Sequence, residues 1–440
     1  MIISLIFPLL NSVFKTEKRF YFCQNSEIAF ILYAIIAYIE CELLKEVNKM
    51  IAKEIESKIS GGSLIRKMFD EGTRLKKIYG DDKVFDFSIG NPDLEPPKEV
   101  KDALIELANA DIPGMHGYMA NAGYPETRKA IADKLSKESG LSIGIDSICM
   151  TCGAASGMNN ILRAIMEPED EIILLAPFFL EYLNYISNVK GVPVIVNTDP
   201  DTFLPIMSEI EKAITPKTKA IIINSPNNPS GAIYPKEVLI ELNALLKKQD
   251  HVIHVISDEP YIDLAYDGMT VPSSLACFDN LIVCFSWSKS LSLPGERIGY
   301  TCVSPNHKDF ELLTQALVLC NRILGAVNAP ALMQRVVAKA LNAKVDVPNY
   351  ERRRNLLYNI ITEAGFTCTK PQGALYLFMK TPIEDTEFCE VCAKYNVLVV
   401  PGSAFKREGY VRLAFCVSEK TILGSKDAFE AIAKELGLKA

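Results

Sequence analysis

Residues 285–299 read FSWSKSLSLPGERIG and carry the strongest local signal in the chain. Lys289 stands just beyond a predicted buried strand, with Ser286 three residues before it and Arg297 eight residues after it. A lysine amine condenses with aldehydes, and a nearby cation keeps part of it deprotonated. Taken without other motifs, Lys289 would be interpreted as a solvated surface charge, so its meaning depends on the rest of the chain.

On either side of this stretch, from Val84 onward, short β-branched runs alternate with longer amphipathic ones. This alternation is typical of a mainly parallel sheet covered by helices. Several of the short runs are continuously apolar, as expected of strands that are buried on both faces. The pattern predicts strands at 147–151, 171–175, 192–196, 219–224, 254–257 and 281–285, and helices at 124–138, 157–166 and 236–247.

Length and composition exclude several classes of protein. A chain of 440 residues is long enough for two lobes or one large α/β unit. Its 49% apolar and 23% charged residues are typical of globular proteins and exclude wholesale disorder and fibrous classes. The net charge of -7, without a long basic run, indicates that nucleic acid is not the principal partner.

Cysteine and histidine usage argues against a disulfide scaffold and a metal centre. Twelve cysteines are too dilute for a disulfide framework and are compatible with a reducing compartment, and four histidines are too few for a histidine-built metal site. Two Cys-x2-Cys dyads, at 149–152 and 389–392, lie 240 residues apart in the chain. We interpret them as small buried hydrophobes rather than zinc ligands, and we expect no metal.

Residues 1–49 form an apolar extension unlike the rest of the chain. Neither of its apolar runs is long enough alone to span a membrane, and its basic residues follow the first run, unlike those of a secretory signal. Three interpretations stay open: a weak membrane anchor, an extra helix packed on the body, and an upstream-extended start. The last is favoured because Met50 opens a polar segment compatible with a helix.

Two further motifs follow predicted strands. CGAASGMN (152–159) lies between a strand and a helix, and its small residues let backbone N–H groups approach an anion; packing at a helix start is the structural alternative. HVISDEPY (254–261) puts Asp258 at the carboxyl end of a buried strand, where α/β sheets place ligands. An acid there needs a partner such as a heterocyclic nitrogen, and Tyr261 is near enough in sequence to reach the same ligand. Capping of a turn is the alternative role for Asp258.

Two more motifs offer polar groups to a ligand. NSPNNPSG (224–231) makes a rigid turn after another apolar strand and presents the amide of Asn228. VRLAF (411–415) places Arg412 in a strand-like run, where its guanidinium should find an anion and matches a carboxylate in a bidentate manner. An ordinary core salt bridge is the alternative for Arg412.

These five stretches, in their order along the chain, resemble the fold-type I pyridoxal-phosphate enzymes, specifically the class I/II aminotransferases. The resemblance runs from about Phe87 to the carboxyl terminus. The resemblance implies a three-layer α/β/α large domain with a mainly parallel sheet over 100–322. It implies a smaller α+β domain formed by 50–99 and 323–440, with 1–49 outside both. It also implies pyridoxal 5'-phosphate as cofactor, and ping-pong transfer of an amino group between an L-amino acid and a 2-oxo acid through a Schiff base at Lys289.

The resemblance assigns roles residue by residue. Lys289 matches the Schiff-base lysine that also moves the proton, and Asp258 matches the acid that pairs with the pyridine nitrogen. Tyr261 and Asn228 match the residues that hydrogen-bond the phenolic oxygen of the cofactor. The groups expected to hold the phosphate are the backbone of Ala154 and Ala155 together with Ser286 and Arg297.

Three further assignments concern stacking, the substrate and the partner subunit. Phe179, in APFFLEY (176–182), matches the aromatic residue that stacks on the cofactor ring. Arg412 is expected to bind the substrate α-carboxylate, assisted by Asn228 and the backbone of Gly90 in SIGNPD (88–93). Tyr118, in HGYMANAGY (116–124), resembles the tyrosine that reaches the phosphate of the neighbouring subunit, which implies a homodimer with shared active sites.

Substrate and reaction type stay open at this stage. Aspartate or an aromatic amino acid is the expected donor from family frequency, and Arg322 and Arg352–Arg354 are unplaced candidates for binding an acidic side chain. A carbon–sulfur β-lyase of the same superfamily is the nearest alternative, and a non-catalytic regulator on the same fold is a remote one. A cytoplasmic enzyme of amino-acid biosynthesis, without a nucleic-acid or membrane partner, is expected.

Overall fold

The computed structural model describes residues 51–61 and 64–438, in two compact units that cover residues 1–62 and 63–440. In the first unit, the described helix is α3 (Lys53–Gly61). The predictions made for residues 1–49 lie outside the described residues. The other described helices and strands belong to the second unit.

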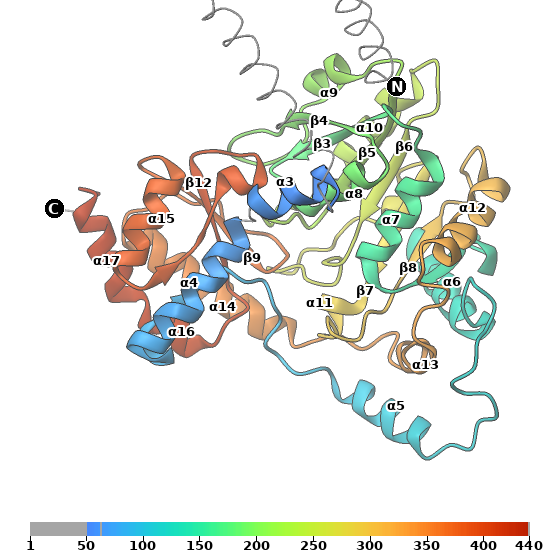
Figure 1. The fold of residues 1–440 in the computed structure, drawn as a ribbon, viewed down its shortest axis with the longest axis horizontal. Helices are drawn as coiled ribbons and strands as arrows, with labels where there is room; N and C mark the ends of the chain where they lie inside the picture. The colour runs from blue at the N-terminus through green and yellow to red at the C-terminus, as the bar shows by residue number, and fades with distance from the viewer. Residues whose placement is uncertain (1–50, 62–63, 439–440) are drawn as a thin grey trace, which may run out of the picture. The chain divides into compact units, whose positions relative to one another are not determined.

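A seven-stranded sheet forms the centre of this unit (Figure 1). Its β-branched runs, such as Ile221–Ile223, form strands because branched side chains pack well on a pleated surface. The five strands from β7 to β4 pair in parallel, whereas β8 pairs antiparallel with both β2 and β7. In spatial order the strands are β2 (Ile148–Thr151), β8 (Gly299–Val303), β7 (Leu281–Ser286), β6 (His254–Asp258), β5 (Thr218–Asn224), β3 (Glu171–Ala176) and β4 (Val192–Asn197).

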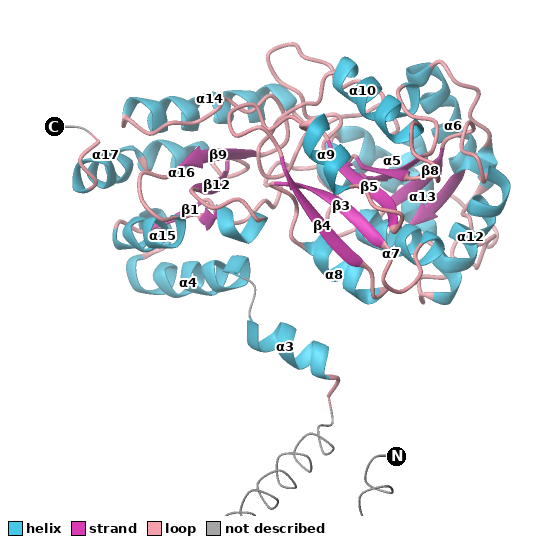
Figure 2. Ribbon diagram, turned by 90° about the horizontal axis from the view of Figure 1, so that it is seen from above, coloured by secondary structure: helices cyan, strands magenta, loops and turns pink. Residues whose placement is uncertain are grey.

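Helices cover both faces of this sheet (Figure 2). Because successive side chains of a strand point to opposite faces, Ile172 and Leu174 of β3 pack with one helical layer and Ile173 and Leu175 with the other. The first layer contains α7 (Gly153–Ile165), α8 (Glu181–Asn188) and α12 (Phe310–Ile323). The second contains α5 (Lys98–Ala108), α6 (Pro125–Ser139), α9 (Met207–Ala213), α10 (Lys236–Lys247) and α13 (Ala331–Lys339).

A second core lies around smaller sheets. β12 (Tyr410–Ala414) pairs antiparallel with β9 (Tyr376–Lys380) and β11 (Val400–Pro401), and β1 (Phe85–Asp86) pairs in parallel with β10 (Val397–Leu398). Pairing of β1 with β10 joins segments about 310 residues apart in sequence, which local patterns do not reveal. The helices of this region are α4 (Leu64–Tyr79), α14 (Val347–Glu363), α15 (Asp385–Lys394), α16 (Glu419–Gly424) and α17 (Lys426–Glu435).

The predicted α/β/α architecture with a mainly parallel sheet is therefore confirmed. All six predicted strands are present within one residue of their expected bounds, and β8 is a strand of the central sheet that was not predicted. The helix predicted from residue 157 begins earlier, at Gly153, because its small residues form the first turn of α7. The domain limits at residues 100 and 322 stay a prediction.

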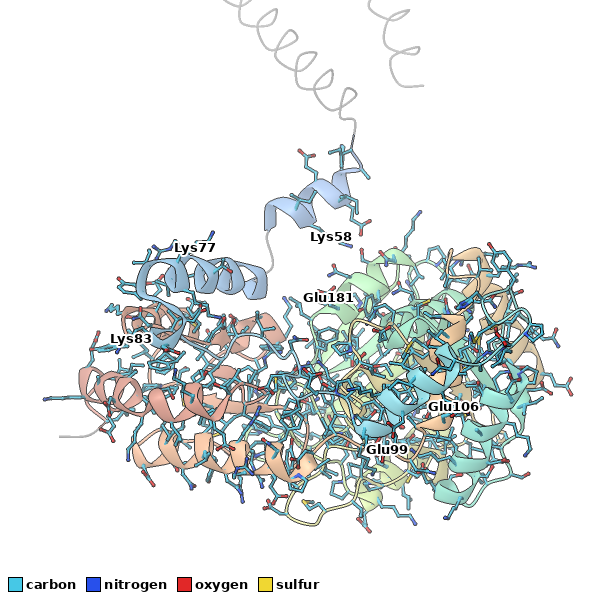
Figure 3. All side chains as sticks on the ribbon, turned by 90° about the horizontal axis from the view of Figure 1, so that it is seen from below. Lys58, Lys77, Lys83, Glu99, Glu106 and Glu181 are labelled. Carbon is cyan, nitrogen blue, oxygen red and sulfur yellow. The ribbon has the colours of Figure 1, made fainter. Side chains whose placement is uncertain are left out.

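Charged side chains cover the outside of the helices, for example Lys77, Glu99, Glu106 and Glu181 (Figure 3). Within the described part of the chain, no helix combines the length and the apolar character that crossing a bilayer requires. Over the same residues, no cluster of three or more metal-ligating side chains is present. Cys149 is buried in β2, and Cys389 and Cys392 are buried in α15.

Candidate active site

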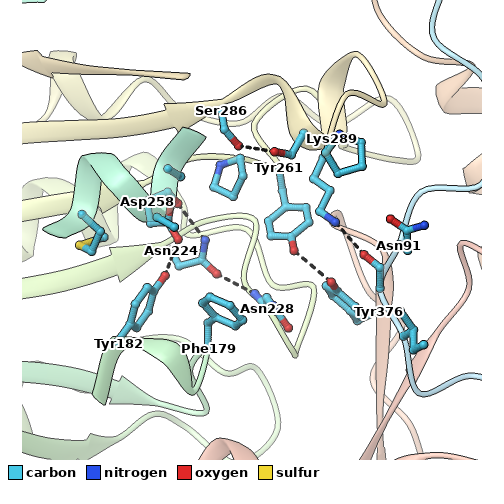
Figure 4. Close-up of a pocket in the computed structure, with 18 of the residues that line it drawn as sticks. Asn91, Phe179, Tyr182, Asn224, Asn228, Asp258, Tyr261, Ser286, Lys289 and Tyr376 are labelled. Atoms are coloured by element: carbon cyan, nitrogen blue, oxygen red, sulfur yellow. Dashed lines mark hydrogen bonds between the residues drawn. The ribbon is translucent and has the colours of Figure 1, made fainter. Parts of the chain in front are cut away.

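A pocket of about 440 Å³ lies where strands β5, β6 and β7 end (Figure 4). The carboxyl ends of parallel strands meet at one edge of a sheet, so the polar residues that end or follow these strands converge there. The pocket brings together the predicted residues Gly90, Ala154, Ala155, Phe179, Asn228, Asp258, Tyr261, Ser286, Lys289, Arg297 and Arg412. Tyr118 is the exception, because it is 94% exposed and does not line the pocket.

Lys289 lies on the short helix α11 (Trp287–Ser290), directly after β7. Its side chain is half-buried and points into the pocket, where Nζ donates a hydrogen bond of 2.6 Å to the carbonyl oxygen of Gly90 (Figure 4). The interpretation of Lys289 as a solvated surface charge is therefore wrong. An amine in this position is available to a carbonyl compound that enters the pocket.

Asp258 ends β6 and is buried. Tyr182 donates a hydrogen bond of 2.6 Å to Oδ2, whereas Oδ1 has no hydrogen-bond partner among the described residues. Burial raises the pKa of Asp258 to about 6, and the hydrogen bond from Tyr182 lowers it in part. A buried acceptor without a partner destabilises the fold, and a protonated ring nitrogen would satisfy it. Capping of a turn, the alternative role for Asp258, does not account for this free oxygen.

One end of the pocket is suited to an anion. Gly153 opens α7 with φ of +79°, which favours glycine, and a Cβ there would lie 2.9 Å from Nη2 of Arg297. Ala154 and Ala155 follow in the first turn of this helix, where backbone N–H groups and the positive end of the helix dipole favour negative charge. Ser286 also faces this end, and its hydroxyl donates to that of Ser288 at 3.1 Å.

Arg412 lies in β12 and is 4% exposed. Its guanidinium donates to Oδ1 of Asn228 at 3.2 Å and to the carbonyl oxygen of Ser88 at 2.8 Å, and it lies 4.4 Å from the centre of the Tyr376 ring. No carboxylate of the described residues is within ion-pair distance of this guanidinium, and its buried Nε has no partner. The core salt bridge considered for Arg412 is therefore wrong, and the cation is available to a ligand carboxylate.

Sequence reasoning missed Tyr182 and Tyr376, which also line the pocket. The hydroxyl of Tyr376 lies 3.1 Å from that of Tyr261, and a Cβ at Gly90 would collide with it. The ring of Phe179 packs edge-on against Tyr182, with centroids 5.7 Å apart. Both tyrosines stand in amphipathic or apolar stretches, where an aromatic residue is typical of a core, so local sequence offered no signal for their polar role.

Asn224 is a further residue that sequence reasoning missed, and its side chain forms hydrogen bonds with two of the motifs. Its Nδ2 donates to the carbonyl oxygen of Asp258 at 2.8 Å, and its Oδ1 accepts from the backbone N–H of Asn228 at 2.7 Å. This pair of bonds fixes the turn after β5 to the end of β6. The positions of Asn228 and Asp258 relative to each other are therefore set by protein groups alone.

Comparison with known proteins identifies the family. A family model described as aminotransferase class I and II matches residues 82–424, which is most of the chain. The chain belongs to this family. An aspartate/prephenate aminotransferase of Thermus thermophilus is 34% identical over 79% of the chain and 90% of that protein, and an aromatic-amino-acid aminotransferase of Thermococcus litoralis is 31% identical over 85% and 96%.

Solved structures of aminotransferases agree with this assignment. An amino transferase from Eubacterium rectale superposes with a TM-score of 0.86 at 38% identity, covering 88% of this chain and 99% of that one. The aspartate aminotransferase of Thermus thermophilus, solved with maleate, gives a TM-score of 0.77 at 29% identity, covering 87% and 100%. The predictions of the family, of a transaminase and of pyridoxal 5'-phosphate as its cofactor are confirmed, and nothing favours the β-lyase.

The residues of the pocket fit this cofactor in chemical type. Lys289 would supply an amine for its aldehyde, and the free Oδ1 of Asp258 would supply an acceptor for its ring nitrogen. The start of α7 and Arg297 would supply N–H groups and positive charge for its phosphate.

Proposed function

We propose that this aminotransferase moves an amino group between an L-amino acid and a 2-oxo acid by a ping-pong mechanism that uses Lys289 as its catalytic amine. The observation that carries this proposal is the meeting of Lys289, Asp258 and Arg412 in one pocket. The amine of Lys289 matches a cofactor aldehyde, and the buried carboxylate of Asp258 matches a ring nitrogen. The buried guanidinium of Arg412, which has no acidic partner, matches a substrate carboxylate.

Pyridoxal phosphate, when bound, supplies the aldehyde that captures the amino group and a ring that accepts electrons from the substrate α-carbon. In our proposal Lys289 Nζ takes and returns the proton at that carbon, and Asp258 keeps the ring nitrogen protonated. Tyr261 and Asn228 would donate hydrogen bonds to the phenolic oxygen, and Phe179 would stack on the ring. The phosphate would be held by the backbone N–H groups of Ala154 and Ala155, with Ser286 and Arg297.

Arg412, with Asn228 and the backbone of Gly90, positions the substrate through its α-carboxylate. Arg412→Lys is expected to lower kcat/KM for an amino acid by about 30- to 5000-fold, because disrupting one partner of a buried charge pair costs about 2–5 kcal/mol and lysine does not reproduce the fork of the guanidinium. Steady-state kinetics with an amino acid and with the amine that lacks its carboxylate provide the measurement and its control. An equal loss for both substrates would contradict the assigned role.

The side-chain specificity is proposed to be for aspartate or an aromatic amino acid, as in the names of the relatives. Among the described residues that line the pocket, the guanidinium groups are those of Arg297 and Arg412, so a second guanidinium for an acidic substrate must come from elsewhere. Arg352, Arg353 and Arg354 pair with Glu419, Asp93 and Asp267, and Arg322 is exposed on α12. A spectrophotometric panel of amino donors against the bound cofactor tests the specificity.

Tyr376→Phe is expected to raise the pH midpoint of the visible absorption of the bound cofactor by roughly 0.4 to 1 unit, the equivalent of one hydrogen bond. The Tyr261 and Tyr376 hydroxyls lie 3.1 Å apart, and either can donate to the other. In the proposed arrangement Tyr261 donates to the phenolic oxygen, so Tyr376 would donate to Tyr261, strengthen it as a donor and so favour the anionic form of the phenolic oxygen. Phenylalanine keeps the ring beside Arg412 and removes this hydrogen bond alone. Absorption spectra recorded across the pH range provide the measurement.

The matched control is Tyr410→Phe, because Tyr410 is also buried but its hydroxyl bonds the carbonyl oxygen of Pro200 away from the pocket. An unchanged midpoint in Tyr376→Phe, or an equal shift in Tyr410→Phe, would show that the two hydroxyls do not act as a pair.

We further propose a homodimer with shared active sites that works in the cytoplasm in amino-acid biosynthesis. The 94% exposure of Tyr118 supports a role toward a neighbouring subunit, and the ten described cysteines are all free thiols, as in a reducing compartment. Sedimentation of the purified protein tests the dimer. The β-lyase alternative predicts pyruvate and ammonia from cystathionine without an oxo acid, and we expect neither product.

A further inference from the structure

A second cavity, of about 560 Å³, lies against the same strand ends as the active-site pocket but is lined by different side chains. Asp258 lines the first pocket, whereas the next residue, Glu259, lines the second. In the same way, Ser286 faces the first pocket and its neighbours Phe285 and Trp287 face the second. This division follows from the strand geometry, because successive side chains leave a strand on opposite faces.

The wall of the second cavity is aromatic. Phe285 and Tyr300 stack with centroids 4.9 Å apart, and Trp287 lies 5.5 Å from Tyr300. Tyr300 is 6% exposed, yet its hydroxyl has no hydrogen-bond partner in the part of the chain that the structure describes. Because Tyr300 lines the cavity and its hydroxyl is not among the fully buried polar atoms, this hydroxyl is free to bond a polar group of a ligand there.

Glu259 supplies a buried carboxylate to the same cavity. It is 7% exposed, and its Oε1 accepts hydrogen bonds from the hydroxyls of Ser257 and Ser274. No residue that the structure describes donates to its other oxygen, Oε2. Burial raises the pKa of Glu259 to about 7, and the two serine hydroxyls lower it in part. A carboxylate in such surroundings gains most from a positively charged partner.

The remaining charges of the cavity leave an excess of negative charge. Lys344 pairs with Asp263 at 2.7 Å, and Lys134 lies 3.9 Å from Glu138 while donating to a backbone carbonyl. Three carboxylates and two ammonium groups thus line the cavity, and Glu259 has neither lysine within ion-pair distance. The volume falls within the range of small-molecule sites, about 300–1000 Å³.

We propose that this cavity is a second binding site, distinct from the active site, for a small organic cation with an apolar body. The cationic nitrogen donates to Glu259 Oε2, and the apolar body lies against the rings of Phe285, Trp287 and Tyr300. Aromatic side chains provide a large apolar surface for such a body. The site is independent of the proposed transaminase chemistry, because no residue assigned to the cofactor or the substrate lines it.

Trp287 is the single tryptophan of the chain and lines the cavity, so its fluorescence reports binding directly. The holoenzyme is titrated at about pH 8.5 with N,N-dimethylphenethylamine, a tertiary amine that does not condense with an aldehyde. We expect a saturable change in Trp287 fluorescence, and binding at least about tenfold weaker for neutral phenethyl alcohol. No saturable change, or equal binding of the alcohol, would overturn the proposal.

Glu259→Gln is expected to weaken binding of the amine by roughly ten- to 150-fold, because a charge-assisted hydrogen bond is lost. Glu106→Gln is the matched control, since Glu106 lies on the outer surface of α5 and pairs with Lys339 of α13. The affinity of this variant for the amine should equal that of the wild type. Should Glu259→Gln not fold, Glu138→Gln at the exposed part of the lining tests the contribution of the cavity's net negative charge, with an expected two- to fivefold loss. Unchanged affinity in the folded Glu variants of the cavity would refute the assignment.

Discussion

Lys289→Ala is expected to lower the transamination rate by about 10⁴-fold, the upper end of what a positioned proton-transfer group contributes. The variant loses the amine that meets the cofactor aldehyde and also the group that moves the proton at the substrate α-carbon. Because Lys289 makes one hydrogen bond, to the carbonyl oxygen of Gly90, the fold should tolerate alanine. Single-turnover kinetics and the visible spectrum of the cofactor-loaded protein provide the measurements.

Lys212→Ala is the matched control for this variant. This variant also loses an amine, but Lys212 is exposed on α9, where it pairs with Glu209 at 2.7 Å. Its rate and spectrum should equal those of the wild type. Retention of the wild-type absorption band, or of more than a small fraction of the rate, in Lys289→Ala would refute the role of this lysine.

Asp258→Asn is expected to reduce kcat by about 30- to 5000-fold at saturating cofactor, the effect of losing about 2–5 kcal/mol from a buried charge pair. Asparagine keeps the shape of the side chain and a partner for the Tyr182 hydroxyl, but its neutral amide does not hold a proton on the ring nitrogen. The dissociation constant of the cofactor should rise as well. Asp133→Asn, which disrupts an exposed pair with Lys129 on α6, should change neither value.

The same substitution has an opposite effect on the stability of the cofactor-free protein. The pKa of Asp258 is raised from 3.8 to about 6 in the folded state, mainly by burial, so the folded chain holds this proton more strongly than the unfolded chain. Stability is therefore lost as the pH rises from about 4 to about 6 and stays lower above that range. At about pH 8, the free energy of unfolding of the Asp258→Asn variant should therefore be about 3 kcal/mol higher than that of the wild type.

Urea unfolding of the cofactor-free proteins at about pH 8 and about pH 4 measures this difference, which should nearly vanish at the lower pH. A variant that is less stable than the wild type at both values would contradict the argument. The opposing effects on activity and stability are typical of an active site that maintains a buried charge for its ligand.

Several of the motif residues were predictable because they end or directly follow a recognisable apolar strand. Asn228 stands in a turn with two prolines, and Asp258 and Lys289 come at the ends of apolar strands that the structure reproduces. The carboxyl ends of adjacent parallel strands meet at one edge of a sheet, and the family resemblance supplied the expectation that these particular strands are adjacent.

The residues that were missed act through contacts between distant segments. Tyr376 reaches Tyr261 across 115 residues of sequence, and Tyr182 reaches Asp258 across 76. The strand order of the central sheet and the pairing of β1 with β10 also depend on distant segments. The free guanidinium of Arg412 became evident only when its surroundings showed no acid, since burial of an arginine is otherwise typical of an ion pair.

Reduction of the holoenzyme with borohydride, followed by peptide mass spectrometry, tests the central claim most directly. Borohydride converts the bond between the cofactor aldehyde and a lysine amine into a stable one, so the cofactor mass stays on the peptide that carries that lysine. The predicted result is a single modified peptide, with the added mass on Lys289. Added mass on another lysine, or on none, would contradict the assignment of the site.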